Sequence, residues 1–154
     1  MNFFQSINYC LKHYSDFNGR ASRSECWWFF LFEYIVVLIG EILDIGFLSY
    51  FDANQEWGIL GTISMVALAL PSFAVGARRL HDINRSGWWQ LLYLVPFTVG
   101  SMLDTVFSSY LDAGQEWGTF ETISYLTFIP LIVWWCTKGT KKNNSHGKPI
   151  KLKK

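Results

Sequence analysis

Two long apolar runs flank one charged segment near the middle of the chain, and this arrangement restricts the fold most. Residues 59–76 contain no charged side chain, and neither do residues 88–103. The segment between them, residues 77–87, carries three arginines, a histidine and an aspartate. A helix that crosses a bilayer needs about 20 predominantly apolar residues. The pattern therefore predicts two transmembrane helices joined by a short polar loop.

Composition extends this prediction to the whole chain. Charged residues make up 16% of the 154 residues, whereas soluble domains have about 25%. The shortfall is concentrated in four apolar segments, which predict four membrane spans at about residues 26–43, 58–77, 88–103 and 118–137. The length fits a single domain. It would contain a first hairpin over 26–77 and a second hairpin over 88–137, and the proline in each of the last three spans is tolerated in membrane helices.

The two ends of the chain differ from the spans. Residues 2–14 place Phe4, Ile7, Leu11 and Tyr14 at helical spacing, which predicts an amphipathic helix lying in the membrane interface, followed by a turn up to residue 22. Residues 138–154 contain seven lysines and predict a solvated basic tail without fixed structure. The expected fold class is therefore all-α: an integral membrane four-helix bundle with an interfacial helix at its N-terminus.

The basic residues predict the orientation. Three of the 13 Lys and Arg precede the first span, three lie between the second and third, and seven follow the fourth. The other two loops carry acidic residues and none of the 13. Cytoplasmic loops are enriched in Lys and Arg, so both termini and the central loop are expected in the cytoplasm. All eight tryptophans fall near the expected interfaces, as in an aromatic belt.

The chain also contains an internal repeat. Residues 48–58 read LSYFDANQEWG and residues 108–118 read SSYLDAGQEWG, an offset of 60. Leu43-Asp44 likewise recurs as Leu103-Asp104. Both halves enter the membrane from the same side, so they predict two parallel-repeat hairpins related by a pseudo-twofold axis along the membrane normal. Either one hairpin was copied and packs on the original, or a site lies on the axis.

Three motifs carry a resemblance to a known family. They are FNGRASRSECW at residues 17–27, RRLHDINRSGWW at residues 78–89, and Gly139 with Asn144 and Gly147 in the tail. Together they resemble the bacterial inner-membrane family catalogued as domain of unknown function 805, over nearly the whole chain. The resemblance implies a fold of membrane helices and an inner-membrane location, and it implies no activity.

The charged residues near the cytoplasmic side are the main candidate site. We expect a cluster that binds the phosphate of an anionic lipid headgroup, because guanidinium groups suit phosphate oxygens. The candidate residues are Arg20, Arg23, Arg78, Arg79, His81, Asp82 and Arg85. The alternative is a set of positive-inside anchors, with Asp82 capping the turn. A catalytic role for His81 with Asp82 is disfavoured, since adjacent residues rarely orient each other as a dyad requires.

Two glutamates lie within the first expected span. Glu33 is about 15 Å from either end of that helix at 1.5 Å per residue, and Glu41 lies closer to its end. A charged carboxylate at mid-membrane costs at least about 2.5–3.5 kcal/mol. Glu33 is therefore expected to be protonated, hydrogen-bonded or facing a wet cavity, and the alternative function is a small transporter or channel that uses it as a proton or cation relay.

Other functional classes find little support. Cys10, Cys26 and Cys136 show no metal-ligand spacing with the three histidines, so we expect no metal, no cofactor and no enzyme. Three carboxylates in an outer loop could bind a cation, but their spacing favours a solvated interfacial helix. The expected partners are membrane lipids and a second copy or another membrane protein, and no nucleic acid.

Overall fold

The computed structural model describes residues 1–48, 58–111 and 119–149. Within these ranges the chain is helical and contains no strand beyond an isolated bridge between Asn144 and Gly147. The α-helices are α1 (Phe3–Lys12), α2 (Arg23–Leu48), α3 (Ile59–Asp82), α4 (Leu91–Leu111), α5 (Thr119–Tyr125) and α6 (Phe128–Cys136). A short 3-10 helix, η1 (Gly87–Gln90), precedes α4. The all-α prediction is thus confirmed.

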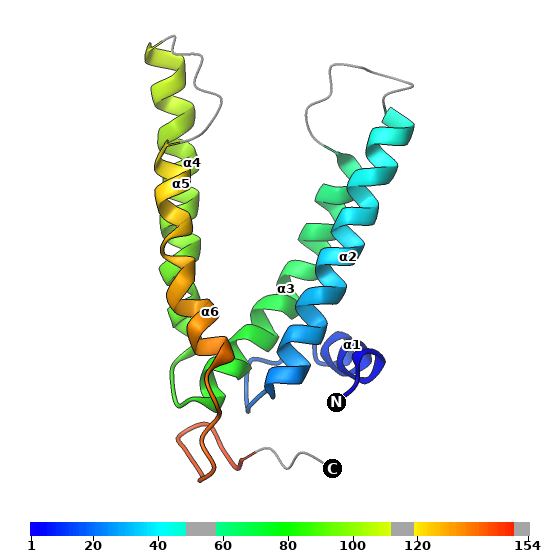
Figure 1. Ribbon diagram of the computed structural model, residues 1–154, viewed down its shortest axis with the longest axis vertical. Helices are drawn as coiled ribbons and strands as arrows, with labels where there is room; N and C mark the ends of the chain where they lie inside the picture. Colours follow the sequence, from blue (N-terminus) through cyan, green and yellow to red (C-terminus); the bar gives the residue numbers. More distant parts are fainter. Residues whose placement is uncertain (49–57, 112–118, 150–154) are drawn as a thin grey trace.

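The helices form two hairpins that diverge from a shared base (Figure 1). In the first, α2 packs on α3; in the second, α4 packs on α5 and α6. The hairpins touch mainly through η1 and α6 at the base, where the buried apolar core also lies. The single packed bundle expected from the sequence is therefore not confirmed, because the helices pair within each hairpin and the hairpins separate above the base.

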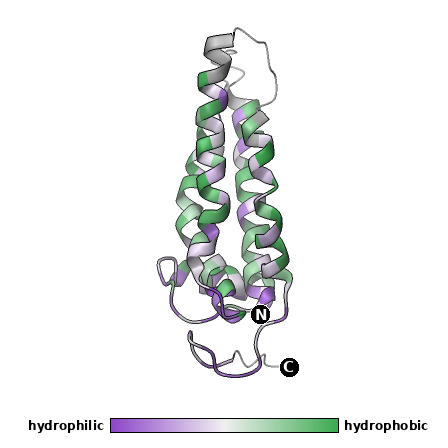
Figure 2. Ribbon diagram, turned by 90° about the vertical axis from the view of Figure 1, so that its left-hand side faces the viewer, coloured by the Kyte–Doolittle hydropathy of each residue, from purple (hydrophilic) through white to green (hydrophobic). Residues whose placement is uncertain are grey.

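Within the described residues, two helices are long and apolar enough to cross a membrane. They cover Arg23–Gly46 and Ile59–Asp82, and a shorter apolar helical stretch covers Thr122–Cys136. Only 17% and 28% of the two most apolar windows are buried inside the protein. A core helix of a soluble protein would be buried, so these exposed apolar faces indicate a lipid environment. Figure 2 shows the apolar residues along the hairpins and the hydrophilic ones gathered at the base.

The fourth expected span is interrupted. Helix α5 ends at Tyr125 and α6 begins at Phe128. Pro130 lacks an amide hydrogen, and its ring collides with the carbonyl four residues earlier, which is that of Leu126. The chain passes this point with tighter turns, in which the Thr127 amide donates to the Ser124 carbonyl at 3.0 Å. Pro71 and Pro96, by contrast, lie within continuous helices.

An aspartate at matching positions starts the returning helix of each hairpin. Asp44 accepts hydrogen bonds from the amides of Leu60 at 3.1 Å and Gly61 at 2.9 Å. Asp104, 60 residues later, accepts one from the amide of Phe120 at 3.1 Å. The first amides of a helix have no partner within the helix, so each aspartate caps the helix that follows the outer loop. This shared contact supports the offset of 60 seen in the sequence.

Glycines at the same offset mark the close approach of the two helices in each hairpin. A Cβ added at Gly40 would lie 2.8 Å from the Gly61 backbone nitrogen, and one added at Gly100 would lie 2.9 Å from the Phe120 carbonyl oxygen. Small residues allow membrane helices to pack backbone to backbone. Most of the repeated segment, at residues 49–57 and 112–118, lies outside the described residues.

Helix α1 lies across the base of the first hairpin, beside α2 (Figure 1). Its N-terminus is closed by a capping box between Asn2 and Gln5. Ser6 and Cys10 are buried against the protein, whereas Phe4 is 79% exposed. Three residues of the apolar stripe predicted from the sequence, Phe4, Leu11 and Tyr14, are exposed, and Ile7 is partly buried; the interfacial position of the helix stays a prediction.

Candidate functional site

Asp82, the last residue of α3, joins two arginines at the base. The Nε atom of Arg20 donates to Asp82 Oδ1 at 2.8 Å, and Arg79 forms an ion pair with Oδ2. The side chains of Arg20, Arg79 and Asp82 are only 2%, 0% and 9% exposed. Because these charges are desolvated, they depend on one another, and removing one of them would leave a buried charge uncompensated.

Both arginines also bind backbone carbonyls of the C-terminal segment. The Nε atom of Arg79 donates to the Trp135 carbonyl at 3.0 Å, and one of its terminal nitrogens donates to the Thr137 carbonyl. Arg20 donates to the carbonyls of Asp82, Thr140, Lys142 and Gly147. Nearly every donor of these two guanidinium groups therefore has an acceptor within the protein.

The tail is folded onto the central loop through residue 149. The Thr140 amide donates to the Asp82 carbonyl at 2.9 Å, and the Asn144 side chain donates to the His81 carbonyl at 2.8 Å. Ser145 bonds the Asn84 side chain at 2.9 Å. The prediction of a tail without fixed structure is therefore wrong for residues 138–149. Its lysines suggested solvation, but Thr140, Asn144 and Ser145 supply the hydrogen bonds that hold it.

Arg78 lies on another side of the base and pairs with Glu25 at 3.2 Å. The pair is covered by α1: the Cys10 sulfur is 3.9 Å from an Arg78 nitrogen, and the Tyr9 ring centroid is 5.4 Å from the guanidinium carbon. Burial raises the pKa of the Cys10 thiol from its ordinary value of 9.0 to about 12, with the Glu25 charge adding to the effect. Cys10 is thus an unreactive thiol that covers the ion pair between Arg78 and Glu25.

Both ring nitrogens of His81 form hydrogen bonds with backbone groups. The Gly87 amide donates to His81 Nε2 at 3.3 Å, so the other ring nitrogen carries the proton and donates to the Gly19 carbonyl at 3.1 Å. The His146 ring from the tail stacks on the His81 ring, with centroids 3.8 Å apart. Both nitrogens therefore position the loops, and neither faces Asp82.

The two remaining arginines are placed differently. The Arg85 guanidinium carbon lies 4.1 Å from the centroid of the Trp134 ring and 6.0 Å from that of the Trp89 ring. This is a cation–π arrangement. Arg23 is exposed, and within the described part of the chain it donates one long hydrogen bond, of 3.4 Å, to the Cys136 carbonyl.

Two cavities adjoin at Arg23. The first, of about 220 Å³, is lined mainly by charged side chains: Arg20, Arg23, Arg79, Asp82, Lys138 and Lys141. The second, of about 380 Å³, is lined by Arg23, Ser24, Trp27, Trp28 and Cys136. We call them the basic cavity and the tryptophan cavity. The basic cavity thus brings five cationic side chains and one carboxylate around one open space at the base.

The structure therefore brings some of the predicted site residues together and separates others. Four of them, Arg20, Arg23, Arg79 and Asp82, line the basic cavity. Arg78, His81 and Arg85 have the separate partners described above. Sequence reasoning missed Lys138 and Lys141, which it treated as part of a free tail, and it missed Glu25. The lysines had no local signal, whereas Glu25 directly precedes the first expected span, close to Arg20 and Arg23, and lies in the first turn of α2.

The two glutamates of the first expected span, Glu33 and Glu41, lie along α2, away from the base. The Ser72 hydroxyl of α3 donates to Glu33 Oε2 at 2.6 Å. Glu41 is exposed and lies near Gly61 of α3. Glu33 therefore joins the two helices of the first hairpin by a hydrogen bond, which is one of the three outcomes expected for it.

No group of three or more potential metal ligands gathers within residues 1–48, 58–111 and 119–149. The outer-loop carboxylates considered for a cation site, Asp52, Glu56, Asp112 and Glu116, lie outside the described residues.

Comparison with known proteins agrees with the motifs and the helical base they build. The family model "Protein of unknown function (DUF805)" matches residues 14–148. The chain belongs to this family. The match begins after α1 and includes the basic cavity and the folded part of the tail. Family membership thus covers both hairpins and the site between them.

Two relatives from Escherichia coli (strain K12) are named inner membrane proteins. The chain is 45% identical to YhaH over 98 residues, which are 64% of this chain and 78% of the relative. It is 31% identical to YhaI over 152 residues, which are 99% of this chain and 98% of the relative. These names support an inner-membrane location for the family. No solved structure matches the chain.

Proposed function

We propose that the protein is a non-enzymatic, four-span component of the bacterial inner membrane whose cytoplasmic base binds anionic lipid headgroups. The observation that carries the proposal is the basic cavity, which five cationic side chains and one carboxylate line at the end of apolar helices. Location follows the relatives, which are named inner membrane proteins.

The proposed topology has four crossings, with both termini in the cytoplasm. Support comes from the two hairpins, which extend from one base, and from the Lys and Arg residues, all of which fall on the base side in the sequence. Single cysteines at Asp52 and Asp112 in a Cys-free background should react with an impermeant thiol reagent in spheroplasts. Reaction of a cysteine placed at Lys148 instead would reverse the orientation.

Headgroup binding relies on the cations that retain free donors. Arg20 and Arg79 direct their donors to Asp82 and to carbonyls, so they contribute positive potential more than hydrogen bonds. Arg23, Lys138 and Lys141 are exposed and line the basic cavity. Juxtamembrane cations of this kind attract anionic lipids by about 1 kcal/mol each.

Lipid retention tests this directly. The full chain should be stabilised by phosphatidylglycerol or cardiolipin and not by a zwitterionic lipid, in a thermal shift or native mass spectrometry experiment. A variant with Arg23, Lys138 and Lys141 changed to Gln should lose this selectivity. A charge-matched control changes Lys12, Lys142 and Lys148, which do not line the cavity. Equal loss in both triple variants would refute a local site.

The non-enzymatic assignment rests on the positions of the candidate acid–base groups. His81 and Asp82 each have full sets of partners and do not contact each other. A dyad needs a base oriented by its neighbour toward an open site. We therefore propose structural roles for both.

The alternative function is transport through Glu33. The Ser72–Glu33 hydrogen bond of 2.6 Å places a carboxyl group between two membrane helices, and ionisable groups within spans often mark proton or ion pathways. A pH-driven flux in proteoliposomes that disappears in Glu33→Gln would favour this function over headgroup binding.

A further inference from the structure

The basic cavity and the tryptophan cavity share Arg23 as a lining residue, so they lie next to each other, and they differ in the side chains that line them. The basic cavity is bounded by charged groups of α2, α3 and the tail. The tryptophan cavity is bounded by the first turns of α2 and by Cys136, the last residue of α6. A molecule that occupies both cavities must have an anionic end and a less polar remainder, and the two parts must join near Arg23.

The charge of the basic cavity sets the charge of its ligand. Five cations line it, namely Arg20, Arg23, Arg79, Lys138 and Lys141, against the single carboxylate of Asp82, which leaves an excess of 5 − 1 = 4 positive charges. A phosphodiester carries one negative charge. A phosphate monoester carries about −1.5 to −2 near neutral pH, and a diphosphate carries more. The monoester and diphosphate therefore neutralise the excess better.

The donors also favour a terminal phosphate. Arg23 offers a planar fork suited to two phosphate oxygens, and among the described residues its guanidinium group donates only the long hydrogen bond, of 3.4 Å, to the Cys136 carbonyl. Lys138 and Lys141 are exposed and line the same cavity, so they can supply further donors. A phosphodiester has only two unesterified oxygens for these three cations, whereas a monoester has three.

The tryptophan cavity indicates where the rest of the ligand lies. Trp27 and Trp28 are each 39% exposed at the start of a helix long enough to span the membrane. Indole rings at such positions lie at the level of the lipid headgroups and glycerol. A lipid whose phosphate enters the basic cavity would place its glycerol and first methylenes beside these rings.

We propose that the two cavities form a binding site for one phosphate-terminated amphiphile, a lipid that ends in a phosphate monoester or a diphosphate. This inference rests on the proposed headgroup-binding function and names the class of headgroup. It predicts a selective site for one molecule in place of a general attraction to anionic lipid. The same phosphate chemistry could come from a soluble compound, and the tryptophan cavity is the feature that favours the lipid source.

The test measures affinities of the purified full chain by native mass spectrometry. The probes are phosphatidic acid and phosphatidylglycerol with identical acyl chains, phosphatidylethanolamine, and inorganic diphosphate as the soluble compound. We expect phosphatidic acid to bind about fivefold more tightly than phosphatidylglycerol, since one further charge near such cations contributes about 1 kcal/mol.

Two matched pairs of variants locate the ligand. Lys141→Gln should weaken phosphatidic acid binding about fivefold, whereas Lys142→Gln, the same change one residue away, should leave it within twofold. Trp28→Leu should weaken phosphatidic acid binding and leave diphosphate binding unchanged. Trp88→Leu is its control, because Trp88 is another exposed tryptophan that does not line the cavity. Helix content by circular dichroism confirms that each variant is folded.

The outcomes separate this inference from the function on which it rests. If both anionic lipids bind equally and better than phosphatidylethanolamine, with Lys141→Gln matching Lys142→Gln, headgroup binding stands and the two-part site is refuted. If the three lipids bind equally, both proposals fail. If diphosphate binds as tightly as phosphatidic acid and Trp28→Leu weakens neither, the site takes a soluble phosphate compound and the lipid assignment is overturned.

Discussion

Replacing Asp82 with asparagine should destabilise the protein more than any other single change of charge at the base. The carboxylate neutralises two arginine side chains that are 2% and 0% exposed. An asparagine keeps the shape, but it removes the charge and turns an amide donor toward one guanidinium group. Breaking a buried ion pair in this way typically costs about 3–5 kcal/mol.

The structure places the expected cost toward the lower end of that range. Arg79 keeps its bonds to the carbonyls of Trp135 and Thr137, and Arg20 keeps those to the tail. These acceptors partly compensate the lost charge. We therefore expect the free energy of unfolding to fall by about 3 kcal/mol, and the tail to become susceptible to proteolysis near Thr140.

Denaturant unfolding in detergent, followed by circular dichroism, measures this change. Asp16→Asn is the control, because Asp16 accepts only the Asn18 amide at 3.0 Å in an exposed turn, and its loss should cost at most about 1 kcal/mol. The double variant Arg79→Met with Asp82→Asn should cost less than the sum of the single changes, since the two side chains are in contact. A cost for Asp82→Asn no larger than that for Asp16→Asn would show that Asp82 does not hold the base together.

Three further predictions concern the helices. Gly40→Ala should destabilise the first hairpin by about 1–3 kcal/mol through overpacking, whereas Gly46→Ala, where an added Cβ meets nothing within 4 Å, should be neutral or stabilising; equal effects in an SDS unfolding titration would contradict the close approach. Glu33→Gln should retain the fold and Glu33→Lys should not, because an ammonium cannot accept the hydrogen bond, as size-exclusion chromatography would show. Cys136 should react with maleimide at pH 8, whereas Cys10 should not, since burial and a pKa raised to about 12 keep the Cys10 side chain a thiol. The stability that the Cys10 thiol contributes is present below about pH 9 and is lost as the pH rises toward 12.

Local patterns were sufficient to predict the parts of the fold that depend on neighbouring residues. Uncharged runs predicted α3 and α4, helical spacing predicted α1, and the repeated Leu-Asp pair indicated equivalent positions, both of which cap a returning helix. The break between α5 and α6 follows from the proline at position 130, so the sequence also contained that signal. Its effect was missed because membrane helices tolerate proline elsewhere in the same chain.

The site depended on contacts that no local pattern encodes. Arg20 meets Asp82 across 62 residues and Thr140 across 120, and each partner is of a type that is ordinarily solvated. Their charge identified the arginines as one group. Which arginines contact Asp82, Glu25 or the tryptophans depends on how three helix ends meet in the fold. The prediction for the tail failed in the opposite way. The lysines indicated a solvated segment, and the few polar side chains that attach the tail to the central loop were overlooked.

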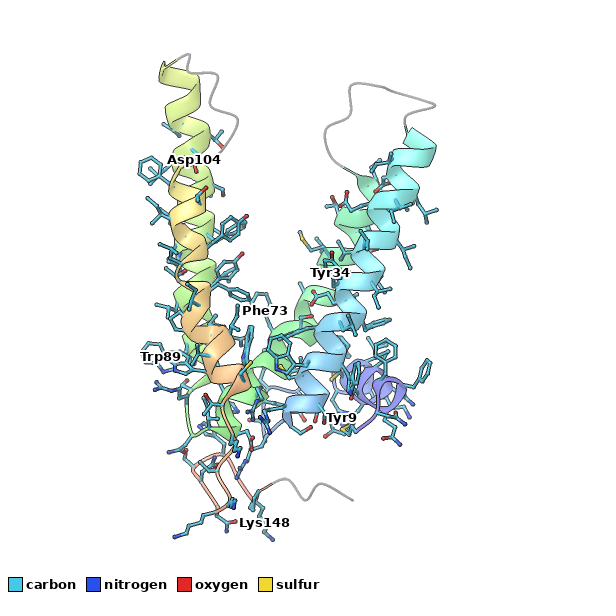
Figure 3. All side chains as sticks on the ribbon, viewed as in Figure 1. Tyr9, Tyr34, Phe73, Trp89, Asp104 and Lys148 are labelled. Atoms are coloured by element: carbon cyan, nitrogen blue, oxygen red, sulfur yellow. The ribbon has the colours of Figure 1, made fainter. Side chains whose placement is uncertain are left out.

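The two halves of the repeat share their outer ends and differ at the base, and this difference explains how one chain joins two similar hairpins. Each hairpin has an aspartate that caps the returning helix and a glycine at the helix contact, and the two sets are 60 residues apart. Figure 3 labels Asp104 of the second hairpin, which lies far from Lys148 at the base. At the same offset, however, Arg78, Arg79 and Asp82 of the first half correspond to Lys138, Gly139 and Lys142 of the second. Arg79 binds the carbonyls that end α6, and Gly139 lies against the Asp82 carboxylate where a Cβ would collide. At the base, the first half of the repeat thus contributes charged side chains and the second half contributes the backbone groups that they contact. A repeat with two identical halves would lack these contacts, which join the hairpins.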